Sequence, residues 1–179
     1  MLLGCLCIAI SCENSDKEID ELGKKKTGVE EAKNIVSYLS ESGKVKAKLT
    51  SPYMLRFLTD SPYIEFPRTL HVDFYNDTAK IESTVDAKYA KYVEFERKVL
   101  LRDSVVVLSL ANGDTLRTQE LWWDQNKQQF YTDKPAEVHQ RDKIIPAQGG
   151  LKAAQNLSWY EFFKVKEGQI AVPNETIPE

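Results

Sequence analysis

The sequence predicts an all-β domain of antiparallel strands, arranged as a sandwich or an elongated roll. Short apolar runs are separated by turn-forming residues at a spacing of about 8–12 residues, as in such folds. Residues Ala79–Tyr89 alternate between small or apolar and mostly charged side chains, which indicates a strand with one dry and one wet face. Residues 99–135 read as a meander. With 179 residues, of which 42% are hydrophobic, the chain is long enough for one domain with a packed core.

The meander at residues 99–135 is the clearest of these signals. Val105–Leu108 is apolar on both faces and β-branched at three of four positions, which indicates a buried strand. Asn112-Gly113 then supplies the positive φ angles of a hairpin turn. The returning strand, Thr115–Trp123, has inward positions that change phase near its middle, so we expect a β-bulge near Gln119-Glu120. A short third strand closes the unit.

The chain before the meander also reads as strands. Val29–Leu39 fits either a helical stripe or a strand, but the alternation in Lys44–Leu49 and the turn between them favour a hairpin. Ser51-Pro52 is expected to break the chain after that hairpin. Further strands are expected at Tyr53–Leu58, Tyr63–Phe66, Leu70–Tyr75 and Ala79–Tyr89.

After the meander, the sequence predicts four more short strands and then a tail. These strands are expected at Ala136–Gln140, Lys143–Ile145, Gly150–Ala154 and the aromatic stretch Ser158–Val165. The expected organisation is a signal segment at residues 1–11, a flexible tether at 12–28, the β-domain at 29–168 and a C-terminal tail at 169–179.

The N-terminal segment suggests a lipid anchor. All three cysteines lie within the first twelve residues, and the apolar run Leu2–Ser11 is too short to span a bilayer as a helix. Ala9-Ile10-Ser11 places small residues before Cys12, which resembles a bacterial lipobox, in which the cysteine is acylated. No Lys or Arg precedes the apolar run, which departs from the usual signal peptide. The alternative is a buried N-terminal strand.

The sequence offers no catalytic, metal-binding or cofactor-binding motif. A net charge of −3 argues against a nucleic-acid partner. His71 and His139 have no second ligand at metal-binding spacing, and no Ser or Cys sits in a nucleophile motif. The remaining signal is a series of inward aromatic side chains. They either fill a closed core or, where two sheets splay apart, line a slot for acyl chains.

Residues 34–163 resemble the LptC family of periplasmic lipopolysaccharide-export proteins, in particular its lipoprotein form from Bacteroidetes-type bacteria. The resemblance rests on the order and spacing of several segments. These are SESGKVKAKLTSP (Ser40–Pro52), LRTQELWWD (Leu116–Asp124), YTDKP (Tyr131–Pro135), and Gly150-Leu151 with Ala154. Two features depart from the family: Gln148 stands where a glycine is common, and the lipobox replaces the usual transmembrane helix.

The resemblance implies a twisted β-jelly-roll with an open hydrophobic groove, acting without a cofactor in the periplasm. Lipopolysaccharide would arrive from an inner-membrane ABC transporter and pass to the next β-jelly-roll protein. Cys12 would be the lipid anchor to the inner membrane, and the C-terminal aromatic strand (Trp159, Tyr160, Phe162, Phe163) would contact a partner. The candidate groove residues are Ile81, Val85, Tyr89, Val107, Leu116, Leu121, Trp123 and Phe130.

Two other functions remain open at this point. A non-transporting envelope lipoprotein would use a closed β-sandwich as an interaction module. An accessory domain of an enzyme that acts on envelope polysaccharide would need a polar cleft with facing carboxylates.

Overall fold

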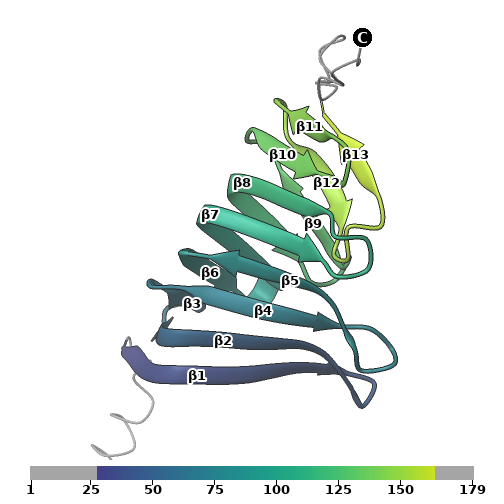
Figure 1. Ribbon diagram of the computed structural model, residues 1–179. Coiled ribbons are helices and arrows are strands. Elements are labelled where there is room, and N and C mark those ends of the chain that lie inside the picture. Colours follow the sequence, from purple (N-terminus) through teal and green to yellow (C-terminus); the bar gives the residue numbers. More distant parts are fainter. Residues whose placement is uncertain (1–27, 164–179) are drawn as a thin grey trace, which may run out of the picture.

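Thirteen antiparallel strands form one twisted sheet in the computed structural model, which describes residues 28–163 (Figure 1). The only helical element within these residues is one 3₁₀ turn, η1 (Glu94–Glu96). The expected all-β antiparallel fold is therefore confirmed. The strands are β1 (Val29–Glu41), β2 (Lys44–Phe57), β3 (Tyr63–Phe66), β4 (Leu70–Tyr75), β5 (Ile81–Ala87), β6 (Tyr89–Val93), β7 (Lys98–Ser109), β8 (Thr115–Asp124), β9 (Gln129–Thr132), β10 (Ala136–His139), β11 (Ile144–Ala147), β12 (Leu151–Ala154) and β13 (Tyr160–Phe162).

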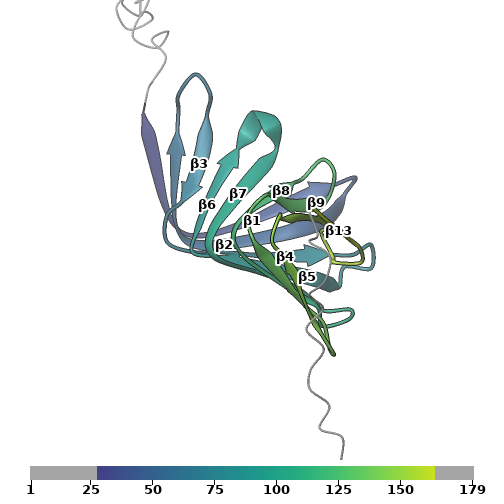
Figure 2. The ribbon, with the colours of Figure 1, turned by 90° about the horizontal axis from the view of Figure 1, so that it is seen from above.

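The sheet bends into two facing halves because its three longest inner strands each change partner midway. Strand β2 pairs first with β4 and then with β3, and β7 pairs first with β6 and then with β5. Strand β8 pairs first with β10 and then with β9. Seen from above, the long strands turn through this bend and the two halves diverge (Figure 2). The dry faces of both halves therefore point toward one interior.

A β-bulge marks the bend between β7 and β8. The register shifts between Arg102 and Val105, so Asp103 and Ser104 together face Gln119. Both residues have positive φ angles, 63° and 56°, and the Ser104 N–H donates to Oε1 of Gln119 at 3.4 Å. The expected phase change in β8 is present, but the extra residue lies on β7, opposite Gln119. The phase change alone could not show which of the two paired strands carries the insertion.

Strand β2 continues without interruption past Pro52, where the sequence predicted a break. The pairing with β4 ends at Thr50 and the pairing with β3 begins at Leu55, so the missing N–H of Pro52 interrupts neither ladder. On the other side, Asn34 of β1 lies opposite Pro52 without pairing, with a φ of 53°. Proline is thus accommodated at the point where the strand changes partner. The expected β1–β2 hairpin is confirmed.

The alternating stretch predicted as one strand over Ala79–Tyr89 is divided in the structure. Val85 and Ala87 of β5 are buried as expected, but Ala79 lies in the preceding turn with a φ of 57°. The pattern ends at Lys88, whose N–H donates to the carbonyl of Asp103 at the bend. Tyr89 then begins β6 in the other half of the sheet. The period of two could not reveal that the chain changes halves at Lys88.

The interior is closed in the middle of the sheet by large side chains from both halves. Phe74 is fully buried, and its ring lies edge-on to Trp123 at 4.9 Å and to Phe130 at 5.9 Å between centroids. Toward the C-terminal end, Gly150 has a φ of +86°, and a Cβ there would lie 2.8 Å from the Cα of Asp133. This close approach lets the turn before β12 pack directly against the backbone after β9.

Candidate functional site

An apolar cavity of about 420 Å³ lies at the N-terminal end of the interior, where the two halves of the sheet do not close on each other. Its volume falls within the range of about 300–1,000 Å³ that is typical of ligand pockets. One wall comes from β1, β2 and β4, and the facing walls come from β3, β6, β7 and β8. Its apolar lining residues are Ile35, Val36, Leu39, Ala47, Leu49, Met54, Ile64, Phe66, Val72, Val99 and Trp123, together with the ring of Tyr92.

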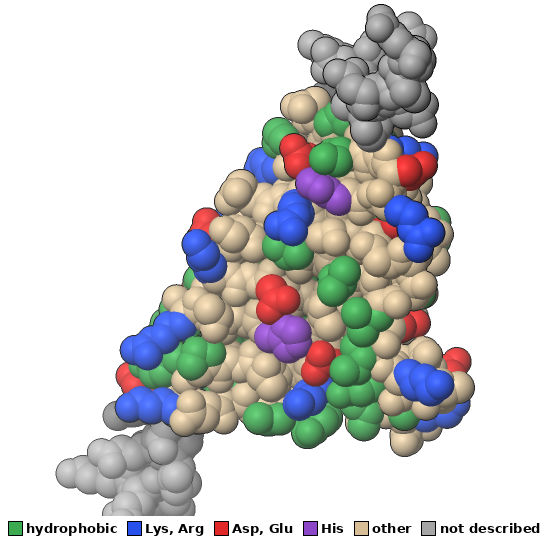
Figure 3. All heavy atoms as spheres, viewed as in Figure 1, with side chains coloured by type: hydrophobic (Ala, Val, Ile, Leu, Met, Phe, Trp, Pro, Cys, Tyr) green, Lys and Arg blue, Asp and Glu red, His purple; other side chains and the backbone are tan. Residues whose placement is uncertain are grey.

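The cavity reaches the surface beside β1, the first strand of the sheet. Within residues 28–163, β1 pairs only with β2, so its second edge carries unpaired backbone groups. Ile35 and Leu39 of β1 line the cavity and are only partly buried. Apolar side chains also gather on the surface over the β1 and β2 end of the molecule (Figure 3). An apolar ligand could therefore enter at this edge.

Of the eight candidate groove residues, the structure places Trp123 on the cavity wall, where it is 3% exposed. Five others are fully buried in the core beyond the cavity: Val85, Val107, Leu116, Leu121 and Phe130. These five belong to the closed middle of the interior.

The remaining two candidates lie outside the core. Ile81 is 39% exposed at the start of β5. Tyr89 is half-buried at the start of β6, and burial together with a hydrogen bond to Glu65 raises its pKa to about 12. Its hydroxyl therefore stays protonated at neutral pH.

Most of the residues that line the cavity were not among those predicted from the sequence. Leu49, Met54 and Ile64 are only partly buried, and they pack against the edge of the core. Their alternation in β2 and β3 was visible, but it matched the pattern of strands that close completely. The signal that could have pointed to them is position, because no strand within residues 28–163 lies beyond β1 to cover this end of the sheet.

The C-terminal aromatic residues lie at the opposite end of the sheet, where β13 pairs with β12 and with no other strand of residues 28–163. The Tyr160 hydroxyl donates to Oδ2 of Asp114 at 3.0 Å. Burial and this hydrogen bond raise the pKa of Tyr160. Tyr160 and Phe162 stack on each other at 6.1 Å and pack against the core, whereas Trp159 is 41% exposed. Phe163 lies under the ammonium group of Lys152, 5.4 Å from its ring centroid.

Several expectations concern residues outside the described range 28–163. The signal segment, Cys12, the tether before residue 28 and the tail from 169 all lie there. Among the described residues, no three His, Cys, Asp or Glu side chains gather in a way that could hold a metal ion. No helix in that range is long and apolar enough to cross a membrane.

Comparison with known protein families gives a match over most of the chain. Residues 2–153 match the family described as lipopolysaccharide-assembly, LptC-related. A search of curated proteins found no match. The matched region includes β1 to β11 and therefore every strand that lines the apolar cavity.

Proposed function

Because the chain belongs to the LptC-related family of lipopolysaccharide-assembly proteins, we propose that its apolar cavity holds an acyl chain of lipopolysaccharide during transfer across the periplasm. The family acts in lipopolysaccharide transport at the periplasmic envelope as a non-catalytic component. In the proposed sequence of steps, the lipid arrives from an inner-membrane ABC transporter and leaves to the next β-jelly-roll protein.

The observation that carries this proposal is the open, apolar end of the interior. Moving a 14-carbon acyl chain from water into such a site is favourable by about 10 kcal/mol. A neighbouring groove of the same kind offers a similar free energy, so transfer between the two is nearly neutral. The direction of movement must then come from the ATP-driven transporter. The domain itself needs an apolar surface and no reactive group.

The two ends of the sheet supply surfaces for the proposed neighbours. Among the described residues, strand β1 leaves thirteen residues with an unpaired edge, and β13 leaves a short edge at the other end. An exposed strand edge can pair with a strand of another protein through backbone hydrogen bonds. We assign the β1 edge to the periplasmic part of the transporter and the β13 edge to the downstream β-jelly-roll. Acylation of Cys12 would hold the chain at the inner membrane.

Site-specific photo-cross-linking in cells tests lipid occupancy. Benzoylphenylalanine replaces Tyr92, which lines the cavity, or Phe95, an aromatic residue three positions later that is 72% exposed. We expect lipopolysaccharide adducts at position 92 and not at position 95. Because both positions are aromatic and lie close together in the chain, they form a matched pair. Adducts at neither position, or only at position 95, would overturn the proposal.

One observation favours a second function. The middle of the interior is closed, since Val85, Val107 and Leu116 are each fully buried. A closed core is what a non-transporting interaction module requires. That function predicts protein adducts from cross-linkers on β1 and no lipid adduct at position 92. Cross-linking at position 92, together with cross-linking from β1, therefore distinguishes the two functions.

A further inference from the structure

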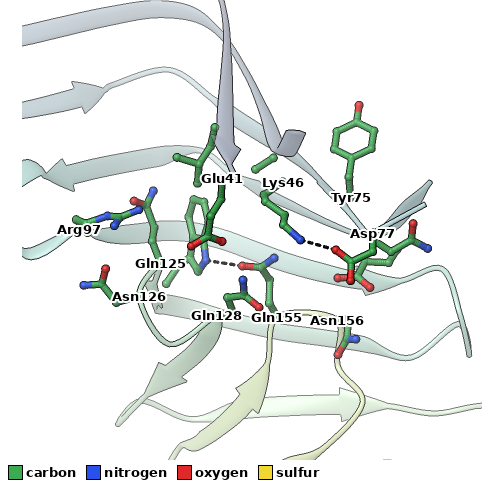
Figure 4. A pocket seen from close by; sticks show the side chains of 15 residues that line it. Glu41, Lys46, Tyr75, Asp77, Arg97, Gln125, Asn126, Gln128, Gln155 and Asn156 are labelled. Atoms are coloured by element: carbon green, nitrogen blue, oxygen red, sulfur yellow. Dashed lines mark hydrogen bonds and ion pairs between the residues drawn. The ribbon is translucent and has the colours of Figure 1, made fainter. Parts of the chain in front are cut away.

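A second, polar pocket of about 360 Å³ adjoins the apolar cavity. The two share four lining residues, Leu39, Ala47, Trp123 and Gln125, and so lie on two sides of one wall. The close-up shows side chains from separate parts of the chain converging on this polar pocket (Figure 4). An amphiphile with its tail in the apolar cavity would meet this pocket with its polar part.

The polar pocket is rich in side-chain amides, which come from three different turns. The β4–β5 turn supplies one, the β8–β9 turn supplies three, and the segment after β12 supplies two. An amide both donates and accepts hydrogen bonds, and so does a sugar hydroxyl. The six residues are Asn76, Gln125, Asn126, Gln128, Gln155 and Asn156.

The charges around the pocket favour an uncharged ligand. Three carboxylates and two cationic side chains leave one net negative charge. Lys46 is already paired with Asp77 at 2.7 Å, and the hydrogen bond and charge of Lys46 lower the pKa of the Asp77 carboxyl. Asp77 therefore stays ionised at neutral pH and is unsuited to act as a proton donor. A phosphate group would meet more negative than positive charge here. The other charged residues are Glu41, Glu82 and Arg97.

The side-chain amide of Gln155 is held in place before any ligand binds. Oε1 of Gln155 accepts a hydrogen bond from the Trp123 indole at 2.9 Å, and this bond does not use the amide hydrogens of Gln155. The backbone of Gln155 is fixed as well. Its backbone N–H donates to the backbone carbonyl of Gln128, and its backbone carbonyl accepts from the Ser83 hydroxyl. Such fixed groups bind with a smaller loss of conformational entropy.

The side-chain amide of Gln125, on the shared wall, has unused hydrogen-bonding capacity. The Gln125 N–H donates to the carbonyl of Arg97 at 3.1 Å, which fixes its backbone. Its side-chain Oε1 is buried and has no hydrogen-bond partner among residues 28–163. A buried polar atom without a partner costs about 1–3 kcal/mol, so a ligand donor that reaches it after a small side-chain rotation would recover part of this.

We infer that the polar pocket binds an uncharged saccharide portion of the same amphiphile whose acyl chain lies in the apolar cavity. This inference rests on the proposed lipid-carrying function and adds to it a defined place for the headgroup. The shared wall at Trp123 and Gln125 then separates the two parts of the ligand and sets its orientation.

The test uses the full-length protein and three separate probes. The first is a neutral, N-acetylated β(1→6)-linked glucosamine disaccharide, the second is the same disaccharide carrying two phosphates, and the third is tetradecanoate. Binding is followed by NMR of the Gln155 side-chain amide and the Trp123 indole N–H. We expect the neutral disaccharide to shift both signals in a saturable manner.

Two variants provide the matched comparison. Asn126→Ala removes an exposed amide at the pocket, and Gln148→Ala removes an exposed amide from the β11–β12 turn, outside this pocket. We expect Asn126→Ala to weaken disaccharide binding by about two- to tenfold, the effect of losing one hydrogen bond. Gln148→Ala should leave binding unchanged. Equal effects of the two variants would overturn the inference.

The probes separate failure of this inference from failure of the proposed function. If only the bisphosphorylated disaccharide binds, the pocket recognises charge and the inference is overturned. If neither disaccharide binds while tetradecanoate shifts the signals of Met54 and Tyr92, the inference is overturned and the lipid-carrying function stands. If tetradecanoate fails to shift those cavity signals, the result counts against the proposed function itself.

Discussion

The indole Nε1 of Trp123 donates a 2.9 Å hydrogen bond to Oε1 of Gln155, and the indole ring also packs edge-on against Phe74. Trp123 thus joins the closed core, the apolar cavity and the polar pocket through one side chain. It comes from β8, whereas Gln155 follows β12, so the bond also links two segments that are distant in sequence.

Replacing Trp123 by Phe should test the importance of this link. The variant keeps an aromatic ring beside Phe74 but leaves Oε1 of Gln155 without its donor, which we expect to destabilise the fold by about 1–3 kcal/mol. The free energy of unfolding is measured by denaturant titration. Trp122→Phe is the control, because Trp122 stacks on Tyr131 and is only partly buried. A larger loss for Trp122→Phe than for Trp123→Phe would contradict this prediction.

Two glycines with positive φ angles allow backbone strain to be separated from steric overlap. Gly113 has a φ of +79° and open space around it, so Gly113→Ala should cost about 1–2 kcal/mol from its left-handed backbone alone. Gly150 has a similar φ, but a Cβ would overlap the carbonyl of Thr132. We therefore expect Gly150→Ala to lower the free energy of unfolding by clearly more than Gly113→Ala, measured in the same titration. Equal losses would show that the turn before β12 can move away.

The stability of the protein should depend on the ionisation of His71. Burial of the imidazole ring lowers its pKa, but hydrogen bonds with Asp86 at 2.7 Å and Asp73 at 3.0 Å outweigh burial and raise the pKa overall. A pKa that is higher in the folded state means that protonated His71 stabilises the fold. This contribution is complete below the ordinary histidine pKa of about 6.5 and is lost as the pH rises through the folded value.

NMR titration of the His71 ring gives the folded pKa directly, and unfolding measured below and above it gives the stability change. His71→Gln should make the pH dependence of stability flatter across this window. A folded pKa at or below the ordinary value would contradict the prediction, as would an unchanged pH profile in the variant.

Filling the apolar cavity should block the lipid without unfolding the protein. Leu49 lines the cavity and is only partly buried, so Leu49→Trp places a larger ring in open space. We expect lipopolysaccharide adducts at position 92 to fall by more than half, measured in the cross-linking experiment. Leu110→Trp makes the same change at a site that is 52% exposed. In that variant the yield of lipopolysaccharide adducts at position 92 should not change. Retained adducts in Leu49→Trp, with normal protein levels, would place the lipid elsewhere.

Most strands and turns of this protein could be predicted from local patterns. The period of two in β5, the apolar run in β7 and the Asn112-Gly113 turn each depend on nearby residues, because backbone geometry and side-chain alternation act over a few positions. The family could be recognised for the same reason, since its segments keep their order and spacing along the chain.

The open cavity was decided only by the tertiary structure. Val85 and Leu49 both lie on the inward face of alternating strands, yet Val85 is fully buried and Leu49 borders open space. Alternation shows which face of a strand is dry, but it carries no information on the distance between two dry faces. That distance depends on where β2, β7 and β8 change partner at the bend, and on the lack of a further described strand beyond β1.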